Sequence, residues 1–232
     1  LGHDLGHTPF GHSGEYILNK ICEDGFTHYE QSVRIVEVLE KDGRGLNLTW
    51  EVRDGIRNHR TSGHPSTLEG AIVRLSDKIA YINHDIDDAI RARMFTEHEL
   101  PRVYTGVLGH SVRERLNNMI HDIILNSMDK PAITMSEGME EAMQGLRKWM
   151  FDNVYKNDIP KAEEGKAQNM ITQLYEYYMG HVDKLPVEYV LLMVNKGEKK
   201  SRVVCDYIAG MSDIYAIDQF EELFVPKRWN VY

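Results

Sequence analysis

The chain has 232 residues, of which 42% are hydrophobic and 27% are charged. These values are typical of a globular protein that buries a core, and the length favours one domain. The net charge of −9 offers no strong electrostatic footprint for nucleic acid, so a small phosphorylated substrate is favoured over a polymer. No apolar run has the length of a membrane span, and only two cysteines are present, so we expect a cytoplasmic protein that does not bind membranes.

Hydrophobic periodicity predicts helices along nearly the whole chain, and no alternating run is long enough to predict a strand. Pro131 and the segment from Asn157 to Pro160 predict helix breaks, because proline cannot continue a preceding helix. The sequence therefore predicts an all-α fold. The predicted helices cover residues 13–22, 29–41, 48–59, 67–95, 107–128, 137–156, 161–181, 186–195 and 200–223.

Chemistry-bearing side chains are densest in the first fifteen residues. They include His3, His7 and His12, with two carboxylates, Asp4 and Glu15, and glycines between them. Imidazole and carboxylate suit Mg, Mn, Fe or Zn, and an adjacent His-Asp pair can give one nitrogen and one oxygen to one ion. The same residues could instead stabilise turns without a metal, and this alternative stays open. A metal site would need a further carboxylate from elsewhere in the chain.

The segment 66–94 is predicted to form a helix with two different faces. Ser66 and Glu69 fit a capping box that would start it. The predicted buried face consists of Leu68, Ile72, Leu75, Ile79, Ile82, Ile86 and Ile90. The opposite stripe consists of Asp77, Tyr81, His84, Asp85 and Asp88, with Lys78 at its edge. A solvated face is the plain alternative, but aspartate is unfavourable in mid-helix, which favours a functional stripe with Asp77 as the missing carboxylate.

Three segments resemble the dGTPase-like branch of the HD-superfamily phosphohydrolases, and they occur in the family's order. They are residues 3–15, 75–88 and 206–213. The resemblance implies an all-α HD-domain helical bundle with additional C-terminal helices. It also implies a single domain over residues 1–232, with a catalytic core of about 1–128 and a helical extension of about 129–232 packed on it.

The resemblance further implies a metal held by four ligands: an upstream histidine, a His-Asp pair and a later aspartate. His3, Asp4 and Asp77 match three of them. The upstream histidine has no counterpart, because the sequence begins two residues before His3, so we expect an N-terminally incomplete chain that lacks one ligand. The implied cofactor is a divalent ion, Mn, Mg or Fe, with Zn or Ni as substitutes in a crystal.

The family reaction is attack of water on the α-phosphorus of a deoxynucleoside triphosphate (dNTP), which yields a deoxynucleoside and inorganic triphosphate. The leaving 5′-oxygen needs a general acid with a pKa near neutrality, and we expect His12 to be this acid. Glu15, one helical turn further, is expected to hold the His12 ring and raise its pKa. His7 and His28 resemble further active-site positions, for which phosphate contact and a structural role remain equally open.

The same resemblance implies substrate contacts from the second stripe. Lys78 would bind phosphate, Tyr81 would pack against the sugar and exclude a 2′-hydroxyl, and Asp85 would accept a hydrogen bond from the 3′-hydroxyl. His84 would line the pocket. For residues 206–213 we favour an architectural role over a nucleotide contact.

Two alternative functions stay open at this stage: an HD phosphohydrolase of nucleoside monophosphates, and a nucleotide-binding regulatory module without turnover. Family members commonly assemble, so the resemblance also implies a homo-oligomer with a regulatory nucleotide as an additional partner. The preferred base of the dNTP, dGTP or another, does not follow from these residues.

Overall fold

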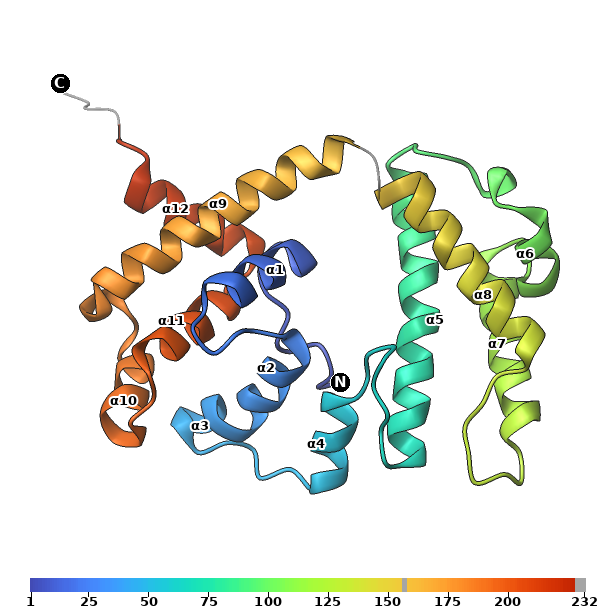
Figure 1. The fold of residues 1–232 in the computed structure, drawn as a ribbon, viewed down its shortest axis with the longest axis horizontal. Helices are drawn as coiled ribbons and strands as arrows, with labels where there is room; N and C mark the ends of the chain where they lie inside the picture. Colours follow the sequence, from blue (N-terminus) through green and yellow to red (C-terminus); the bar gives the residue numbers. More distant parts are fainter. Residues whose placement is uncertain (156–157, 228–232) are drawn as a thin grey trace. The chain divides into compact units, whose positions relative to one another are not determined.

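The computed structural model describes residues 1–155 and 158–227, and Figure 1 draws its helices in sequence colours. Every regular element in these ranges is helical, and they contain no strand. The predicted all-α fold is therefore confirmed. None of the described helices is long and apolar enough to cross a lipid bilayer.

The chain divides into two compact units. The first unit is formed by residues 1–57 together with the described residues from 161 onward, and the second unit is formed by residues 58–160. Both ends of the described chain thus contribute to one unit, and the middle of the chain forms the other. The assignment of residues 1–128 and 129–232 to a core and an extension of one domain stays a prediction.

The first unit packs the N-terminal helices against the C-terminal ones, and in Figure 1 the blue α1 and α2 lie beside the red α11. Its centre is fully buried at Leu18, Ile171 and Ile208. Its elements are α1 (Gly11–Ile21), α2 (His28–Arg34), a π-helical turn (Ile35–Leu39), α3 (Glu40–Gly43), α4 (Trp50–Arg57), α9 (Asp158–Gly180), a 3-10 turn (Val182–Lys184), α10 (Val187–Lys196), α11 (Lys200–Ala209) and α12 (Asp213–Phe224).

A buried ion pair joins α2 to α11 inside the first unit. The carboxylate of Asp206 is fully buried and accepts hydrogen bonds from Arg34 Nε at 2.9 Å and Nη2 at 2.7 Å, and from Gln31 Nε2 at 2.9 Å. Burial alone would lower the pKa of Arg34, but Asp206 and Glu198 raise it above its ordinary value, so the guanidinium stays charged. This contact agrees with the architectural role favoured for residues 206–213.

The second unit is built around the long helix α5 and the helices that follow it. Its core includes the fully buried Ile86, Met119 and Leu146, and the buried Arg115 donates from Nε to Asn83 Oδ1 of α5 at 3.0 Å. Arg115 also pairs with Glu97. Its elements are α5 (Leu68–Arg91), a 3-10 turn (Glu97–Glu99), α6 (Arg102–Leu108), α7 (Val112–Ser127), α8 (Glu137–Met150) and a π-helical turn (Phe151–Tyr155).

Two predicted helices run across the boundary between two helices of the structure. The prediction over 107–128 is wrong because Gly109, at φ 123°, ends α6, and the hydroxyl of Ser111 then accepts from the Glu114 N–H at 3.2 Å and starts α7. The prediction over 200–223 is also wrong. There α11 ends at Ala209, and the hydroxyl of Ser212 accepts from the Tyr215 N–H at 3.2 Å to start α12. Serine caps thus interrupt runs whose apolar periodicity reads as continuous.

The predicted break before Pro160 is placed differently in the structure. Helix α9 already begins at Asp158, so Pro160 lies in its first turn, where the N–H that proline lacks would have no helical partner. Residues 156 and 157, which carry the end of the predicted helix 137–156 and part of the predicted break, lie outside the described residues.

The start of α5 differs from the prediction in its cap and in its buried face. Thr67, rather than Ser66, is the N-cap residue, and its hydroxyl accepts from the Gly70 N–H at 3.1 Å. Leu68 and Ile72 are 45% and 49% exposed, because they precede the part of α5 that reaches the core of the second unit. The predicted apolar stripe is buried at Leu75, Ile79, Ile82 and Ile86.

Thr67→Ala is therefore expected to lower the free energy of unfolding by about 1 kcal/mol, because the Gly70 N–H loses its cap. Urea denaturation followed by circular dichroism measures this loss. Thr67→Ser keeps the hydroxyl oxygen and serves as the matched control, for which most of the stability should remain. Equal losses in both variants would show that the methyl group, and not the cap, is responsible.

Candidate active site

The loop that carries the His-Asp pair is held against α2 by Ser32. The Ser32 hydroxyl accepts from the Gly6 N–H at 2.9 Å and donates to the carbonyl oxygen of His3 at 2.8 Å. A Cβ at Gly6 would overlap the carbonyl oxygen of His28, so only glycine permits this close approach. The position of His3 and Asp4 beside α2 follows from these contacts.

The entry into α1 is held by the start of α12. Phe10, the N-cap residue of α1, has a left-handed backbone at φ 63°, and its N–H donates to Asp213 Oδ1 at 2.9 Å. The hydroxyl of Thr8 donates to the carbonyl oxygen of Gly11 at 2.9 Å. The last helix described thus orients the first one, on which His12 and Glu15 lie.

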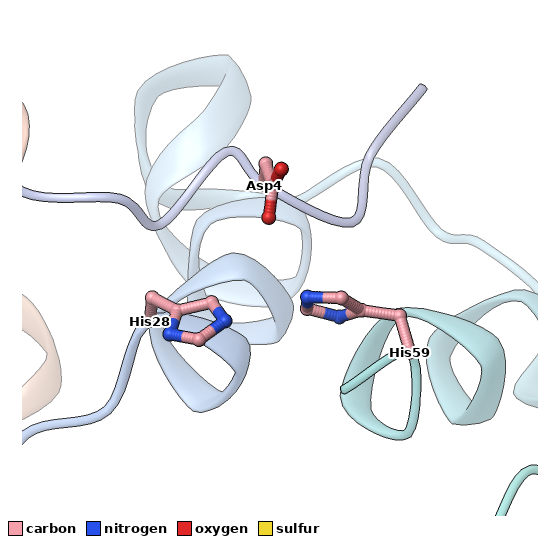
Figure 2. Close-up of side chains that lie close together, drawn as sticks. All are labelled: Asp4, His28 and His59. Atoms are coloured by element: carbon pink, nitrogen blue, oxygen red, sulfur yellow. The ribbon is translucent and has the colours of Figure 1, made fainter. Parts of the chain in front are cut away.

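The Asp4 carboxylate lies between two imidazoles of its own loop. His3 Nε2 is 3.1 Å from Asp4 Oδ2, and His7 Nε2 is 3.4 Å from Asp4 Oδ1. Figure 2 shows that this carboxylate also points toward the ring of His28, and each offers a ligand atom within 4.8 Å of the other. His59, the third side chain drawn there, is a residue of the second unit. Nitrogen and oxygen donors therefore converge around Asp4 inside the first unit.

Glu15 connects two histidines from different helices. Its Oε2 lies 3.3 Å from His12 Nδ1, and its Oε1 lies 3.0 Å from His28 Nδ1 and accepts from the His28 N–H at 2.9 Å. Burial alone would raise the pKa of Glu15, but the hydrogen bonds with His12 and His28 outweigh it and hold this pKa well below its ordinary range. Glu15 is therefore a carboxylate at neutral pH and orients both rings.

The imidazoles of His7, His12 and His28 form one cluster. The ring of His7 stacks on that of His28 with centroids 4.5 Å apart, and the ring of His12 lies 5.7 Å from His7 and 6.1 Å from His28. His28 is nearly buried, whereas the His12 side chain is 69% exposed. An exposed ring held at one nitrogen by a carboxylate can exchange a proton with a bound molecule, and its neighbours can bind an anion.

The remaining predicted site residues lie on α5 in the second unit. Asp77, Lys78 and Asp85 are half-buried, and Tyr81 and His84 are exposed. Because they belong to a different unit from His3 and Asp4, the joint ligand set of His3, Asp4 and Asp77 stays a prediction.

Two further cations, Arg74 and Arg147, lie near Lys78, and the sequence analysis did not single them out. Burial lowers the pKa of Lys78, the charges of Arg74 and Arg147 lower it further, and Glu140 opposes them. The guanidinium of Arg147 lies 5.7 Å from the centre of the Tyr81 ring. Arg74 precedes Lys78 by one helical turn and could have been found on the same helical wheel. Arg147 lies on α8, and only the packed structure brings it near.

The donors of the first unit fit a divalent cation. His3 and Asp4 offer one nitrogen and one oxygen 3.1 Å apart, both side chains are partly exposed, and a second imidazole lies next to the same carboxylate. This mixture of nitrogen and oxygen donors suits Mn, Mg, Fe or Zn.

Comparison with protein families identifies the class of protein. The HD domain family matches residues 1–82, which include the His-Asp pair, the histidine cluster and Asp77. The phosphohydrolase-associated domain family matches residues 133–222. HD domains bind divalent metals, and together the two matches define an HD-domain phosphohydrolase with a helical C-terminal region.

Similarity to individual proteins defines the family more closely. The chain is 54% identical to a deoxyguanosinetriphosphate triphosphohydrolase-like protein of Caldanaerobacter subterraneus subsp. tengcongensis, over 99% of this chain and 67% of the relative. Proteins with the same description from Clostridium perfringens strain SM101 and Geobacter sulfurreducens are 42% and 35% identical, over 98% and 97% of this chain and 68% and 72% of the relatives. The chain belongs to the family of deoxyguanosinetriphosphate triphosphohydrolase-like proteins.

Proposed function

We propose that the protein hydrolyses deoxynucleoside triphosphates, dGTP or another dNTP, to deoxynucleoside and inorganic triphosphate by attack of water on the α-phosphorus. The observation that carries the proposal is the carboxylate of Glu15 hydrogen-bonded to both His12 and His28, beside the His-Asp pair. The relatives are described as deoxyguanosinetriphosphate triphosphohydrolase-like proteins, and this description suggests the substrate class. Such a site suits a reaction in which an alkoxide must gain a proton as it leaves.

In this proposal His12 is the general acid that protonates the leaving 5′-oxygen, and Glu15 holds its ring at Nδ1. Glu15 orients His28 through the same carboxylate, and His7 stacks on His28, so these two imidazoles form the inner wall of the cluster. We assign phosphate contacts to His7 and His28. Exposure increases from His28 through His7 to His12, which places the proposed acid at the most accessible position.

In this proposal the cofactor would be Mn, Mg or Fe, and His3, Asp4 and Asp77 would hold it. When bound, the ion supplies a Lewis acid that withdraws electron density from a phosphoryl oxygen. The contribution of the chain itself is to present the ligands, and Ser32 and Gly6 do this by fixing the loop against α2.

The α5 side chains would bind the substrate. Lys78 and the neighbouring Arg147 are proposed to contact the phosphates, since two cations close together favour a polyanion. Tyr81 would stack on the sugar, Asp85 would accept from the 3′-hydroxyl, and His84 would line the pocket. By family resemblance we also propose that the protein is a cytoplasmic homo-oligomer that binds a regulatory nucleotide.

The deciding experiment separates the phosphorus products. Full-length protein is incubated with each dNTP and with Mn or Mg, and the products are resolved by ion-exchange chromatography and phosphorus NMR. We expect inorganic triphosphate and deoxynucleoside in equal amounts, and comparison of the rates identifies the preferred base. Orthophosphate from monophosphate substrates would favour the monophosphatase alternative, and dNTP binding without products would favour the regulatory module.

Tyr81→Ala is expected to reduce discrimination between dNTP and NTP substrates by about tenfold or more, because the ring that would oppose a 2′-hydroxyl is removed. The kcat/KM ratio for dGTP over GTP measures the effect. Tyr81→Phe keeps the ring and serves as the control that should retain the ratio. An unchanged ratio in Tyr81→Ala would remove Tyr81 from the sugar contact.

A further inference from the structure

The two cysteines of the chain, far apart in sequence, lie together in the first unit. Cys22 is the C-cap residue of α1 and Cys205 lies on α11; they are 5% and 0% exposed and belong to the same apolar cluster. Glu23 and Asp24, which follow Cys22, contact Ser201 and Lys199 at the start of α11, and both cysteines are reduced. None of the roles discussed above uses either thiol.

The surroundings make the two sulfurs chemically unequal. The neighbouring Cys205 lowers the pKa of Cys22 to about 7 against the opposing effect of burial, and the Asp24 backbone and the charge of Arg202 contribute to the lowering. Cys22 and burial raise the pKa of Cys205. Cys22 is also the less buried of the two sulfurs, so we assign it the attacking role and Cys205 the resolving role.

Contacts on either side already hold the two helices at this point. Lys199 Nζ lies 2.7 Å from Asp24 Oδ1, and the Ser201 hydroxyl lies 3.4 Å from Glu23 Oε2. Asp24 and Arg202, which both act on the Cys22 sulfur, also line a surface pocket of about 540 Å³. The pocket brings solvent to side chains that neighbour Cys22, which is itself 5% exposed, and a second thiol is present to resolve the product.

We propose that Cys22 and Cys205 are a reversible thiol-oxidation site that reacts with a small hydroperoxide and closes a disulfide between α1 and α11. The Cys22 sulfur attacks the peroxide, its O–O bond breaks, and a sulfenic acid forms while the other oxygen leaves as water or alcohol. The Cys205 sulfur then attacks the sulfenic sulfur, and the hydroxyl group leaves as water with the Cys205 proton. Two thiols are oxidised, one hydroperoxide is reduced, and a dithiol reductant reverses the change.

The test treats the folded full-length protein with hydrogen peroxide, then alkylates it in denaturant and maps its peptides. We expect a single intramolecular Cys22–Cys205 disulfide, and a smaller share of this disulfide among the oxidised products of urea-unfolded protein, because folding supplies the proximity for the second attack. The midpoint of thermal unfolding should rise by about 5–10 °C and return after treatment with dithiothreitol. Two alkylated thiols, a disulfide between chains, or a lowered midpoint would overturn the proposal.

Single-cysteine variants separate the two steps. In Cys205→Ser, Cys22 should stop at the sulfenic acid and be trapped by a dione reagent, whereas Cys205 in Cys22→Ser should resist the same treatment. Labelling of Cys205 in place of Cys22 would reverse the assigned roles. The disulfide map of the unmodified protein does not depend on these variants and decides the proposal even if one of them fails to fold. The site is also independent of the proposed hydrolysis.

Discussion

Replacing His12 by alanine is expected to lower kcat on the preferred dNTP by about 10²–10⁴-fold while metal affinity stays unchanged. His12 is the most exposed ring of the imidazole cluster, and Glu15 holds it at Nδ1, as a general acid requires. It is not one of the proposed metal ligands, so the loss should appear in turnover alone. Steady-state release of deoxynucleoside and calorimetric titration with Mn measure the two quantities separately.

Two variants bracket this result. His110→Ala removes an exposed histidine that has no proposed role and should retain full activity, whereas Asp77→Ala should lose metal binding and turnover together. Retained turnover in His12→Ala would exclude His12 as the acid.

Glu15→Gln tests whether the carboxylate acts through the imidazoles. We expect a comparable loss of kcat, and a His12→Ala/Glu15→Gln double variant should lose much less than the product of the two single effects, because the residues act as a unit. Fully multiplicative losses would show that Glu15 acts independently of His12. The double variant should still lose somewhat more activity than His12→Ala alone, because Glu15 also holds His28 through the same carboxylate.

Asp206→Asn is expected to lower the free energy of unfolding by about 3–5 kcal/mol, because the guanidinium of Arg34 would lose its buried counter-ion. The midpoint of thermal unfolding should fall by about 10 °C for a chain of this size. Urea denaturation monitored by circular dichroism gives the free energy, and differential scanning calorimetry gives the midpoint.

The exposed pair of Arg44 and Asp42 supplies the control. The Asp42 side chain is 93% exposed and lies 3.9 Å from the guanidinium, so Asp42→Asn should change the stability by no more than about 0.5 kcal/mol. A loss below about 1 kcal/mol in Asp206→Asn would mean that Glu198, the other partner of Arg34, compensates for the missing charge. Replacing Arg34 and Asp206 together by apolar residues should recover part of the loss.

The parts of the fold that depend on local patterns could be predicted from the sequence. The helical class, the long α5 and the Glu15–His12 pair follow from periodicity and from a spacing of three residues within one helix. The helix breaks at Gly109, which ends α6, and at Ser212, which caps the start of α12, were not predicted, because apolar periodicity continues across both positions. At these points a local turn overrides a pattern that extends over a longer stretch.

The parts that depend on packing could not be predicted in the same way. Nothing in the spacing of the chain indicates that Glu15 binds His28 at least as closely as His12, or that Arg147 lies over Tyr81. The contact between Cys22 and Cys205 was also unexpected, since each lies in an ordinary helical context. The exposed Leu68 and Ile72 show the reverse case, in which a regular apolar stripe extends beyond the core that would bury it.

The ion pair between Arg34 and Asp206 also determines when the first unit can complete its folding during translation. The two residues are 172 positions apart, so at about 5–20 residues per second the ribosome needs roughly 10–30 s after making Arg34 before it adds its counter-ion. The hydrogen bond between Phe10 and Asp213 can form only slightly later, when Asp213 has been added. During that interval the nascent chain carries α1 and α2 without the helices that bury them, and the second unit is translated in full before Asp206 is added. The burial of α1 against the C-terminal helices is therefore a late event, and a chaperone that shields the first 57 residues would act before release of the chain.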